Sequence, residues 1–473
     1  MTDVDLVVAG AGGGLAGALR GAELGLDVLV VESNPHFARG NNTSMSTAMV
    51  PGPGSRFQAA AGVSDSPEQF LADVAAKTHG SADPAVSGTL AGVGAELVEW
   101  LADHVGMPIE LPTDFTYPGH SVPRVHTVPG RHGSSMLRYL VDAATAAERV
   151  DLLVPCRLVD ARPAPGGTRV AVVEHPDGQR EEISTRAVLL ATNGFGADAE
   201  LVRMHLPEIA DARYHGSEHS RGDALRIGSA HGAASGCLDA YQGHAGLSAA
   251  AQTLLTWTAV MHGAAVVDGT GRHFGDETTG YSEYAATLAA RPGGRSWMIF
   301  DERIDGLCRA FGDYLDVVGA GAVRTADTVA ELAAAIRVPA DALAEEVAAL
   351  GAVSRGEVGD RFGRTVEAEL SAPLHAVEIV SALFHTQGGL LVDANARVLD
   401  AGGSPLPGLY ACGGAAVGMS GHGAAGYLAG NGLLPALGLA YLAAGHLARS
   451  TPSPTTPSPA AAPSATSSPR GDR

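Results

Sequence analysis

A run of glycines near the start of the chain combines with one carboxylate in a pattern typical of a nucleotide site. Gly10, Gly12 and Gly14 fall in GAGGG, directly after the apolar segment LVVAG. Backbone amides without side chains can approach a pyrophosphate there, and the partial positive charge of a following helix N-terminus favours the phosphates. Glu32 lies 22 residues after Gly10, where a carboxylate can accept hydrogen bonds from both ribose hydroxyls. The pattern predicts a dinucleotide site but does not distinguish FAD from NAD.

The segments around these residues read as strand, turn, helix and strand. We expect the strands at 6–10 and 28–32, with a helix of small residues between them. A strict GxGxxG motif would place its third glycine at position 15, which is Leu15 here. We therefore expect Gly14 or Gly17 to let the helix pack closely against the strand.

Changes in pattern along the chain predict two domains and a tail. The apolar spacing at 325–350 is helical, with Asp327 and Asp341 near the expected helix starts, and a buried closing helix is expected at 433–448. The predicted units are a first segment of a Rossmann-like nucleotide-binding domain at 1–205, an inserted α+β capping domain for the substrate at 206–355, a second nucleotide-binding segment at 356–449, and a Pro/Ser/Thr/Ala-rich tail at 450–473 that buries too little apolar surface to become ordered.

Composition excludes several classes of function. The 473 residues include 31 Lys and Arg against 51 Asp and Glu, so the net charge of −20 opposes binding to nucleic acid. No apolar run reaches the ~20 residues that a membrane span needs. Lys77 is the only lysine, and its context fits neither a P-loop nor a Schiff base. The four cysteines lack metal spacing, as do His120, His126 and His132, so we predict no metal site and a cytoplasmic protein.

Further motifs occur in an order that resembles the fumarate reductase/succinate dehydrogenase flavoprotein superfamily. The motifs are ESNPHFARGNNTSMSTAMVPG at 32–52, ATNGFG at 191–196, RGDALRIG at 221–228, GRHFGDE at 271–277, HTQGGLLVD at 385–393, and GLYACGG followed by GNGLL. The resemblance covers the whole chain except the tail. It implies an α/β fold in which a Rossmann-like FAD-binding domain carries an inserted α+β capping domain.

The resemblance also implies a set of residues that hold FAD. The amides at the start of the closing helix would stabilise negative charge on the flavin. Succinate dehydrogenases attach the flavin through a histidine in the segment after Glu32, where this chain has NNTSMS, so we expect FAD to be bound without a covalent link. Besides the glycines and Glu32, the implied residues are Ser33, Asn42, Thr43, Ser44, Cys156, Thr192, Asn193, Asp223, Gly413, Gly432, Leu433 and Leu434.

Two tyrosines stand where fumarate reductases of this superfamily have arginines. Tyr281 is four residues after Glu277, and Tyr427 is four residues before Asn431. This substitution resembles the 3-ketosteroid Δ1-dehydrogenases and related cyclic-ketone desaturases. In those enzymes one tyrosine, as phenolate, removes the proton alpha to a ketone, while the other donates a hydrogen bond to the ketone oxygen together with a backbone amide. Flavin N5 takes the beta hydride. A tyrosine of ordinary pKa ~10 is a weak base at neutral pH, so Tyr281 needs a field that favours its phenolate.

Three further residues are assigned to the substrate. His385 precedes TxGG, as in fumarate reductases, and either binds a substrate carboxylate or carbonyl or only forms a hydrogen bond near the flavin. Tyr117 resembles an aromatic residue that lines the steroid pocket, although packing between domains is the alternative. Asn431 belongs to the GNG run. The two catalytic tyrosines could equally be core aromatics, and His244 is interpreted as structural.

The sequence thus predicts an FAD-dependent oxidoreductase acting on CH–CH groups. The expected reaction is desaturation of a cyclic ketone, such as a 3-oxosteroid or 4-oxocyclohexanecarboxylate, with electrons passing to a quinone, O₂ or another redox protein. The alternatives are reduction of an activated alkene, for which no arginine is found at the matching position, and a flavin-binding redox module without catalysis.

Overall fold

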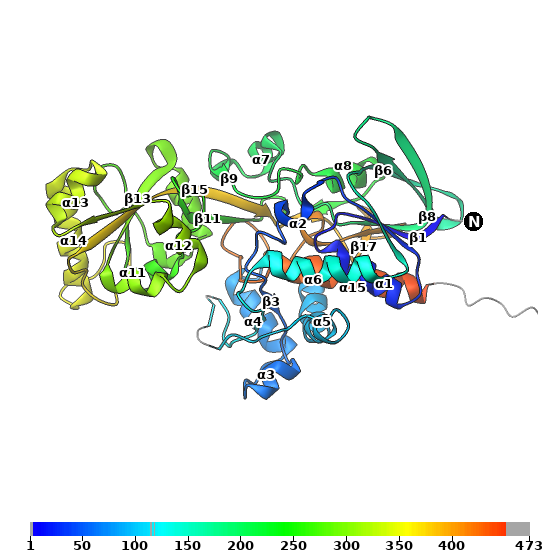
Figure 1. Cartoon of the computed structure of the whole chain (residues 1–473), viewed down its shortest axis with the longest axis horizontal. Coiled ribbons are helices and arrows are strands. Elements are labelled where there is room, and N and C mark those ends of the chain that lie inside the picture. Colours follow the sequence, from blue (N-terminus) through cyan, green and yellow to red (C-terminus); the bar gives the residue numbers. More distant parts are fainter. Residues whose placement is uncertain (1–2, 114–115, 118, 451–473) are drawn as a thin grey trace, which may run out of the picture.

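Two large β-sheets lie toward opposite ends of the molecule, and the long strand β15 (Leu374–Thr386) runs between them (Figure 1). The computed structural model describes residues 3–113, 116–117 and 119–450. Of the tail predicted at 450–473, residues 451–473 lie outside the described residues. Among the described residues, no helix combines the length and apolar character needed to cross a bilayer.

The first sheet contains the βαβ unit expected from the sequence. Its central strand pairs in parallel with both neighbours, so that Val8 lies opposite Val30 on one side and Leu189 on the other. A strand that is buried on both faces consists almost entirely of apolar residues, and such a run can be recognised in the sequence. In spatial order the strands are β17 (Arg397–Leu399), β18 (Pro405–Ala411), β8 (Arg180–Leu190), β1 (Val4–Ala9), β2 (Val28–Val31) and β5 (Val150–Leu153), and β7 (Arg169–Glu174) and β6 (Arg157–Pro163) continue from β8.

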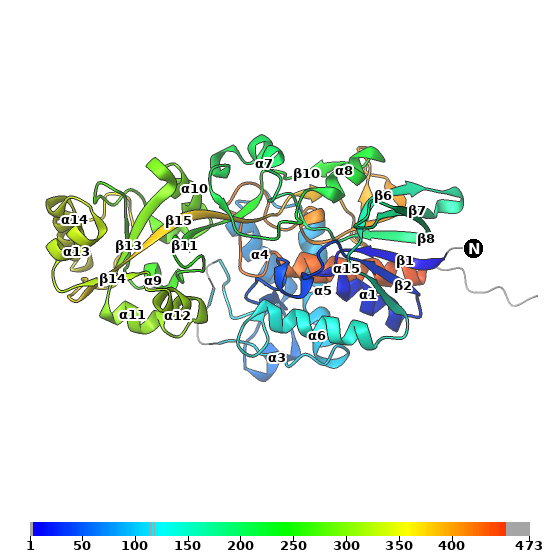
Figure 2. The same cartoon turned by 45° about the horizontal axis from the view of Figure 1, so that its top comes forward.

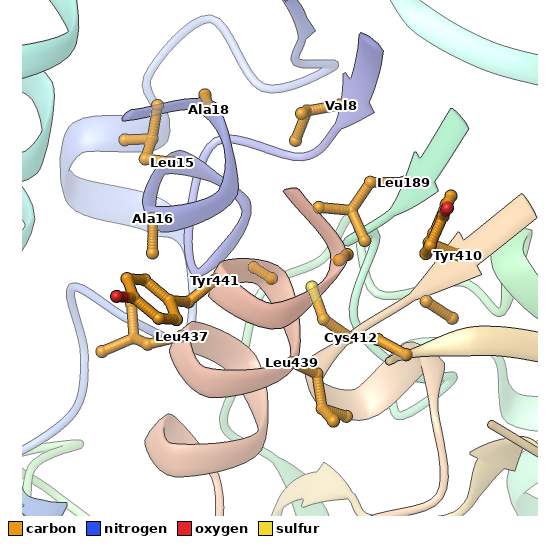
Figure 3. Packing of buried hydrophobic residues seen from close by; sticks show 14 of the residues in the cluster. Val8, Leu15, Ala16, Ala18, Leu189, Tyr410, Cys412, Leu437, Leu439 and Tyr441 are labelled. Carbon is orange, nitrogen blue, oxygen red and sulfur yellow. The ribbon is translucent and has the colours of Figure 1, made fainter. Parts of the chain in front are cut away.

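Helix α1 (Gly14–Glu23) packs against the closing helix α15 (Leu433–Arg449), which confirms the helix expected at 433–448. A Cβ atom on Gly13 would lie 2.6 Å from Cβ of Ala436, so the missing side chain allows this contact. In Figure 3, Ala16 of α1 points toward Leu437 and Tyr441 of α15. The pair holds the glycine turn and the start of α15 side by side.

A group of helices not predicted from the sequence flanks this domain. It comprises α3 (Arg56–Ala60), α4 (Pro67–Lys77) and α5 (Pro84–Asp103), and Figure 1 shows it below the first sheet. Arg124 is fully buried and its Nε lies 2.9 Å from the Asp65 carboxylate, which ties the loop before α4 to a later segment. The remaining elements around the first sheet are α2 (Phe37–Gly40), α6 (Gly133–Ala146), α7 (Ala199–His205), α8 (Asp223–Ala230), and the short pairs β3 (Val50–Pro51) with β4 (Val125–His126) and β10 (Ser235–Gly236) with β16 (Gly389–Leu390).

The second sheet is centred on β15. Its strands are β11 (Tyr241–Ser248), β15, β13 (Arg295–Asp301) and β12 (Ala265–Val267), with β14 (Val323–Ala326) and β9 (Arg213–Tyr214) also paired to β15. Its helices are α9 (Thr258–Met261), α10 (Glu283–Ala289), α11 (Glu302–Cys308), α12 (Gly312–Gly319), α13 (Val329–Ile336) and α14 (Ala340–Ser354), of which the last two lie farthest from the N-terminus (Figure 2). The domain boundaries stay a prediction, and β15 lies beyond the predicted end of the capping domain at residue 355.

The helices in this region start near Asp327 and Asp341, as expected, but neither carboxylate is the cap. Thr328, rather than Asp327, caps α13, because its hydroxyl accepts a hydrogen bond from the Glu331 amide. Helix α14 begins after Pro339, which places Asp341 inside the first turn. A proline fixes the backbone at a helix start, so the carboxylate is not needed as the cap.

Candidate active site

One cavity of about 820 Å³ is lined by the glycine turn and by both tyrosines. We call the part around Gly10, Glu32 and Asp223 the nucleotide end, and the part around Tyr281 and Tyr427 the tyrosine end. The first sheet and α1 position the nucleotide end. The tyrosine end is assembled from loops that come from three separate regions of the chain.

The glycines of the turn are required by close contacts. Gly10 has a φ of 113°, and a Cβ atom there would lie 2.3 Å from the carbonyl oxygen of Ala191. A Cβ on Gly12 would lie 2.9 Å from the Thr43 hydroxyl, and one on Gly14 would lie 2.7 Å from the side chain of Val8. Gly17 is equally close to Leu189, at 2.9 Å. Both glycines proposed to replace the third glycine of the motif therefore pack against the sheet.

Glu32 is held with its carboxylate against the glycine turn. One carboxylate oxygen accepts a hydrogen bond from the Ala11 amide at 2.8 Å, and the other accepts one from the Asn34 amide at 2.7 Å. Only 8% of the residue is exposed. The next residue, Ser33, contacts His219 at 3.3 Å. These bonds fix the carboxylate beside the turn where a ribose would lie.

Most of the residues assigned to FAD line this cavity. Ser44 and Leu434 do not, because the Ser44 hydroxyl donates to the Asn41 carbonyl at 2.7 Å and Leu434 is fully buried in α15. Those that line it are Gly10, Gly12, Gly14, Glu32, Ser33, Asn42, Thr43, Cys156, Thr192, Asn193, Asp223, Gly413, Gly432 and Leu433.

Several residues around the cavity have buried polar atoms without a hydrogen-bond partner in the described chain. They are Thr192 Oγ1, the Asn41 amide nitrogen, the Asn431 amide oxygen and both polar atoms of the Gln387 side chain. Unpaired polar atoms are costly in a protein interior. Their concentration beside a glycine-lined cavity fits a large polar cofactor such as FAD.

The two predicted catalytic tyrosines lie against each other. Their ring centroids are 5.6 Å apart and the rings are inclined at 63°. Burial raises the pKa of Tyr281 well above its usual value, and the adjacent Tyr427, through its charge and a hydrogen bond, raises it further. Burial also raises the pKa of Tyr427, while the same hydrogen bond opposes the rise. Both phenols are therefore protonated at neutral pH.

Short hydrogen bonds hold the loop of Tyr281 in place. The Tyr281 carbonyl accepts from the Ala245 amide at 3.0 Å, and the Ser282 hydroxyl accepts from the Gly243 amide at 3.0 Å, so β11 supports the loop on both sides. Four residues earlier, Glu277 is fully buried and accepts hydrogen bonds from Arg364 at 3.0 Å and His273 at 2.8 Å.

The loop of Tyr427 is held by Asn431. Its amide nitrogen donates to the Gly426 carbonyl at 3.2 Å and to the Ser420 hydroxyl at 2.8 Å. Asn431 lines the cavity as predicted, but these bonds commit its amide nitrogen to the loop itself.

Two histidines at the tyrosine end have opposite tautomers. His385 Nδ1 lies 3.3 Å from the Thr386 carbonyl, which can only accept, so the proton is on Nδ1. His244 Nδ1 accepts from the Gly246 amide at 2.9 Å, so its proton is on Nε2. Burial lowers the pKa of His385 to about 4 and that of His244 to about 3. Both rings are neutral at pH 7, and only His244 can donate from Nε2.

Positive charge is scarce around the cavity. Among the described residues that line it, Arg157 is the only arginine or lysine, and its guanidinium is paired with Asp223 at the nucleotide end. The tyrosine end is lined instead by aromatic and aliphatic side chains, including Trp257, Met261, Leu307 and Phe311. A carboxylate bound there would find no lysine or arginine among the described lining residues.

A known family model, described as an FAD binding domain, matches residues 5–433. The chain belongs to this family. Its sequence is 26% identical over 418 residues to the NADH:fumarate oxidoreductase of Klebsiella pneumoniae (strain 342), covering 86% of this chain but 44% of that protein. It is 30% identical over 328 residues to the 4-oxocyclohexanecarboxylate 2-dehydrogenase of Sinomonas cyclohexanicum, covering 56% of this chain and 54% of that protein. The chain thus spans about half the length of these two relatives.

Solved structures of this family share the fold. An open flavocytochrome c3 fumarate reductase matches with a TM-score of 0.80 and 25% identity, over 94% of this chain and 78% of that one. The 3-ketosteroid Δ1-dehydrogenase of Sterolibacterium denitrificans matches with a TM-score of 0.75 and 22% identity, over 95% of this chain and all of that one. The predictions of the superfamily, the α/β fold and FAD as cofactor are confirmed, and the oxidoreductase activity on CH–CH groups stays a prediction.

The fold brings several residues of this FAD-binding protein to the tyrosine end that the sequence motifs did not indicate. His244 stacks on Tyr281 with a centroid distance of 4.7 Å and on Phe384 at 5.3 Å. Trp257 and Gln387 also line the cavity. The HxG spacing within the buried strand β11 is the only signal that could have pointed to His244, and it is too common to be specific.

Proposed function

We propose that this flavoprotein desaturates an uncharged cyclic ketone between its alpha and beta carbons. The observation that carries the proposal is the pair of phenols at one end of the cavity, in a part of the described lining without arginine or lysine. Bound FAD supplies the two-electron acceptor for the beta hydrogen. The protein must then acidify the alpha C–H bond and stabilise charge on the ketone oxygen.

The two tyrosines divide these tasks. Tyr281 is the base that takes the alpha proton, and Tyr427 donates a hydrogen bond to the ketone oxygen. Tyr427 lies at the end of the loop that leads into α15, whose N-terminal amides, at Gly432 and Leu433, face the cavity and favour negative charge. The raised pKa of Tyr281 means that the reaction accelerates as pH rises, because more of the phenol becomes phenolate.

The other assigned residues shape the substrate site. Tyr117 packs in a small cluster with Met49 and Ala429 and lines the cavity wall. His385 is close to the start of α15, since a Cβ atom on Gly432 would lie 3.1 Å from its Nε2. Because His385 is neutral and its Nε2 carries no proton, it offers a substrate carboxylate no counter-charge and can only accept a hydrogen bond there. Asn431 acts by holding the Tyr427 loop.

The residues that line the nucleotide end bind FAD without a covalent bond. Glu32 would accept hydrogen bonds from the ribose, the glycine turn would hold the pyrophosphate, and Asn42 and Thr43 would contact the flavin. The electron acceptor is a quinone, O₂ or a redox protein. We place the cap between about residue 206 and the end of β15.

Anaerobic titration of the FAD-loaded protein with ketones tests this function. We expect a neutral polycyclic ketone, such as a 3-oxosteroid, to bleach the flavin absorbance band. The test should include 4-oxocyclohexanecarboxylate, because the Sinomonas relative is a dehydrogenase of that compound. Bleaching by that compound alone would shift the substrate to the smaller, charged ketone, and no bleaching by either would refute desaturation.

A second candidate is the reverse reaction, reduction of an activated alkene. The raised pKa of Tyr281 favours it, because a phenol that is neutral at pH 7 can deliver a proton. Anaerobic reoxidation of the dithionite-reduced flavin by an enone, faster than by fumarate, would support this direction. Faster reoxidation by fumarate would contradict the role of the phenols.

A further inference from the structure

The only lysine of the chain is buried against the active-site loops. Lys77 is the last residue of α4, and its ammonium donates a hydrogen bond to Glu283, the first residue of α10. The two side chains are only 19% and 20% exposed. The pair therefore joins the helical group beside the FAD-binding domain to the capping domain, across 206 residues of sequence.

Three loops, each with one tyrosine of the cavity, meet at this pair. A Cβ atom on Gly119 would lie 3.4 Å from the Lys77 stem and 3.0 Å from Leu428, so the turn after Tyr117 lies between Lys77 and the Tyr427 loop. A Cβ on Gly280 would lie 2.5 Å from the Glu283 carboxylate, which places that carboxylate against the residue before Tyr281.

A neighbouring contact ties two of these loops together. His120 Nε2 donates to the Ala429 carbonyl at 3.1 Å, and the His120 ring stacks on Phe70 of α4. Helix α4 thus supports the Tyr117 and Tyr427 loops through Phe70, which stacks on His120. It reaches the Tyr281 loop through Lys77.

The charges around Tyr281 give the pair an electrostatic role. The neighbours of Tyr281 are the phenols of Tyr427 and Tyr117, the neutral His244 ring and the Glu283 carboxylate. The negative charge of Glu283 raises the pKa of Tyr281. Burial raises the pKa of Glu283, and Lys77 opposes the rise. The Glu283 charge also raises the pKa of Tyr241 in β11, whose hydroxyl donates a hydrogen bond to Glu208.

We propose that Lys77 is a positioning residue that acts through Glu283, holding the Tyr281 loop against the other two tyrosine loops and cancelling the negative charge beside the phenols. The inference rests on the proposed role of Tyr281 as the base. It assigns a function to the lysine that neither the cofactor site nor the substrate site uses directly.

The test is the pH profile of flavin reduction by a saturating ketone in single-turnover experiments. We expect Lys77→Met to leave the Glu283 carboxylate without a counter-charge. The midpoint of the pH profile should then lie about one pH unit higher, so that the reduction rate at a fixed pH below the midpoint falls about tenfold. Glu283→Gln should move the profile to lower pH. The double variant should return toward the wild-type profile, and Lys77→Arg should retain it.

The control is Arg56→Met, which removes one cation from an exposed ion pair with Asp103 in the same group of helices. It should leave the profile unchanged. A rate that falls equally at every pH in Lys77→Met, without recovery in the double variant, would mean that Lys77 only stabilises the fold and would overturn the proposal. Flavin absorbance of each purified variant shows whether it has folded around FAD.

A second readout separates this inference from the proposed function. The ionisation of Tyr281 can be followed by ultraviolet absorbance as the difference between each protein and its Tyr281→Phe counterpart. Lys77→Met should raise the pH of that ionisation even if no ketone reduces the wild-type flavin, in which case only the proposed function fails. An unchanged ionisation would refute the role of Lys77 whatever the substrate.

Discussion

The two ends of the cavity are built on different physical principles. At the nucleotide end, Glu32 is fixed by backbone amides, and Arg157 is paired with Asp223, so charged groups are matched before any ligand binds. At the tyrosine end, the neutral Tyr281 and His244 rings are stacked, with His244 buried and Tyr281 partly buried. The first end suits a charged cofactor that always stays in place. The second suits a neutral molecule whose charge develops only during reaction.

The two ends of the cavity also differ in how far apart their residues are in the sequence. The glycine turn and Glu32 lie within one βαβ unit, whose spacing in sequence fixes their spacing in the fold. The tyrosine end combines residues 117, 244, 281 and 427, which are far apart in sequence and meet only in the folded chain. Substitutions at the two ends should therefore separate cofactor binding from chemistry.

The largest expected effect is at Tyr281. Tyr281→Phe keeps the ring that stacks on His244 but removes the base, so flavin reduction should slow by about 10²–10⁴-fold while FAD content is unchanged. Stopped-flow bleaching of the flavin measures the rate. Tyr139→Phe, which changes a phenol on α6 away from the cavity, is the matched control. Undiminished reduction would remove Tyr281 from the mechanism.

Tyr427→Phe should have the next largest effect. Loss of one hydrogen-bond donor to a developing oxyanion typically costs about 10²–10³-fold in rate. Because the Tyr427 phenol also raises the pKa of Tyr281, the pH at which the rate rises should move to lower values in this variant. A change in rate of less than about twofold would support the interpretation of Tyr427 as a core aromatic.

The elements that could be predicted from the sequence are those that need particular residue types at neighbouring positions. The strands at 6–10 and 28–32, the glycine turn and the closing helix all follow from apolar runs and small residues. The helices α3 to α5 were not predicted, because their amphipathic pattern specifies a buried face but not the partner it packs against. The same limit explains the missed His244, whose contact with Tyr281 joins residues 37 positions apart in sequence.

The glycine turn should tolerate no side chain. Gly10→Ala would place a methyl group 2.3 Å from the Ala191 carbonyl and force a residue with a side chain to adopt a φ of 113°. Strain of about 1–3 kcal/mol should weaken FAD binding by roughly 5- to 150-fold. Gly88→Ala, in α5 where a Cβ atom meets nothing within 4 Å, is the control. Equal FAD affinity in both variants, measured by fluorescence titration of the apoprotein, would contradict the predicted site.

The smallest expected effect is a flat response at His385. Its folded pKa of about 4 lies below the ordinary value of 6.5, so the ring is neutral from pH 5.5 to 7.5 and its charge does not change in this window. The affinity for a neutral ketone should accordingly vary by less than about twofold across it. If His385 bound a carboxylate as the charged imidazolium, affinity for 4-oxocyclohexanecarboxylate would fall as pH rises through 6.5, and His385→Gln would abolish that dependence. If the affinity for the charged ketone is weak and does not change with pH, the tyrosine end excludes charged ketones because it provides no counter-charge.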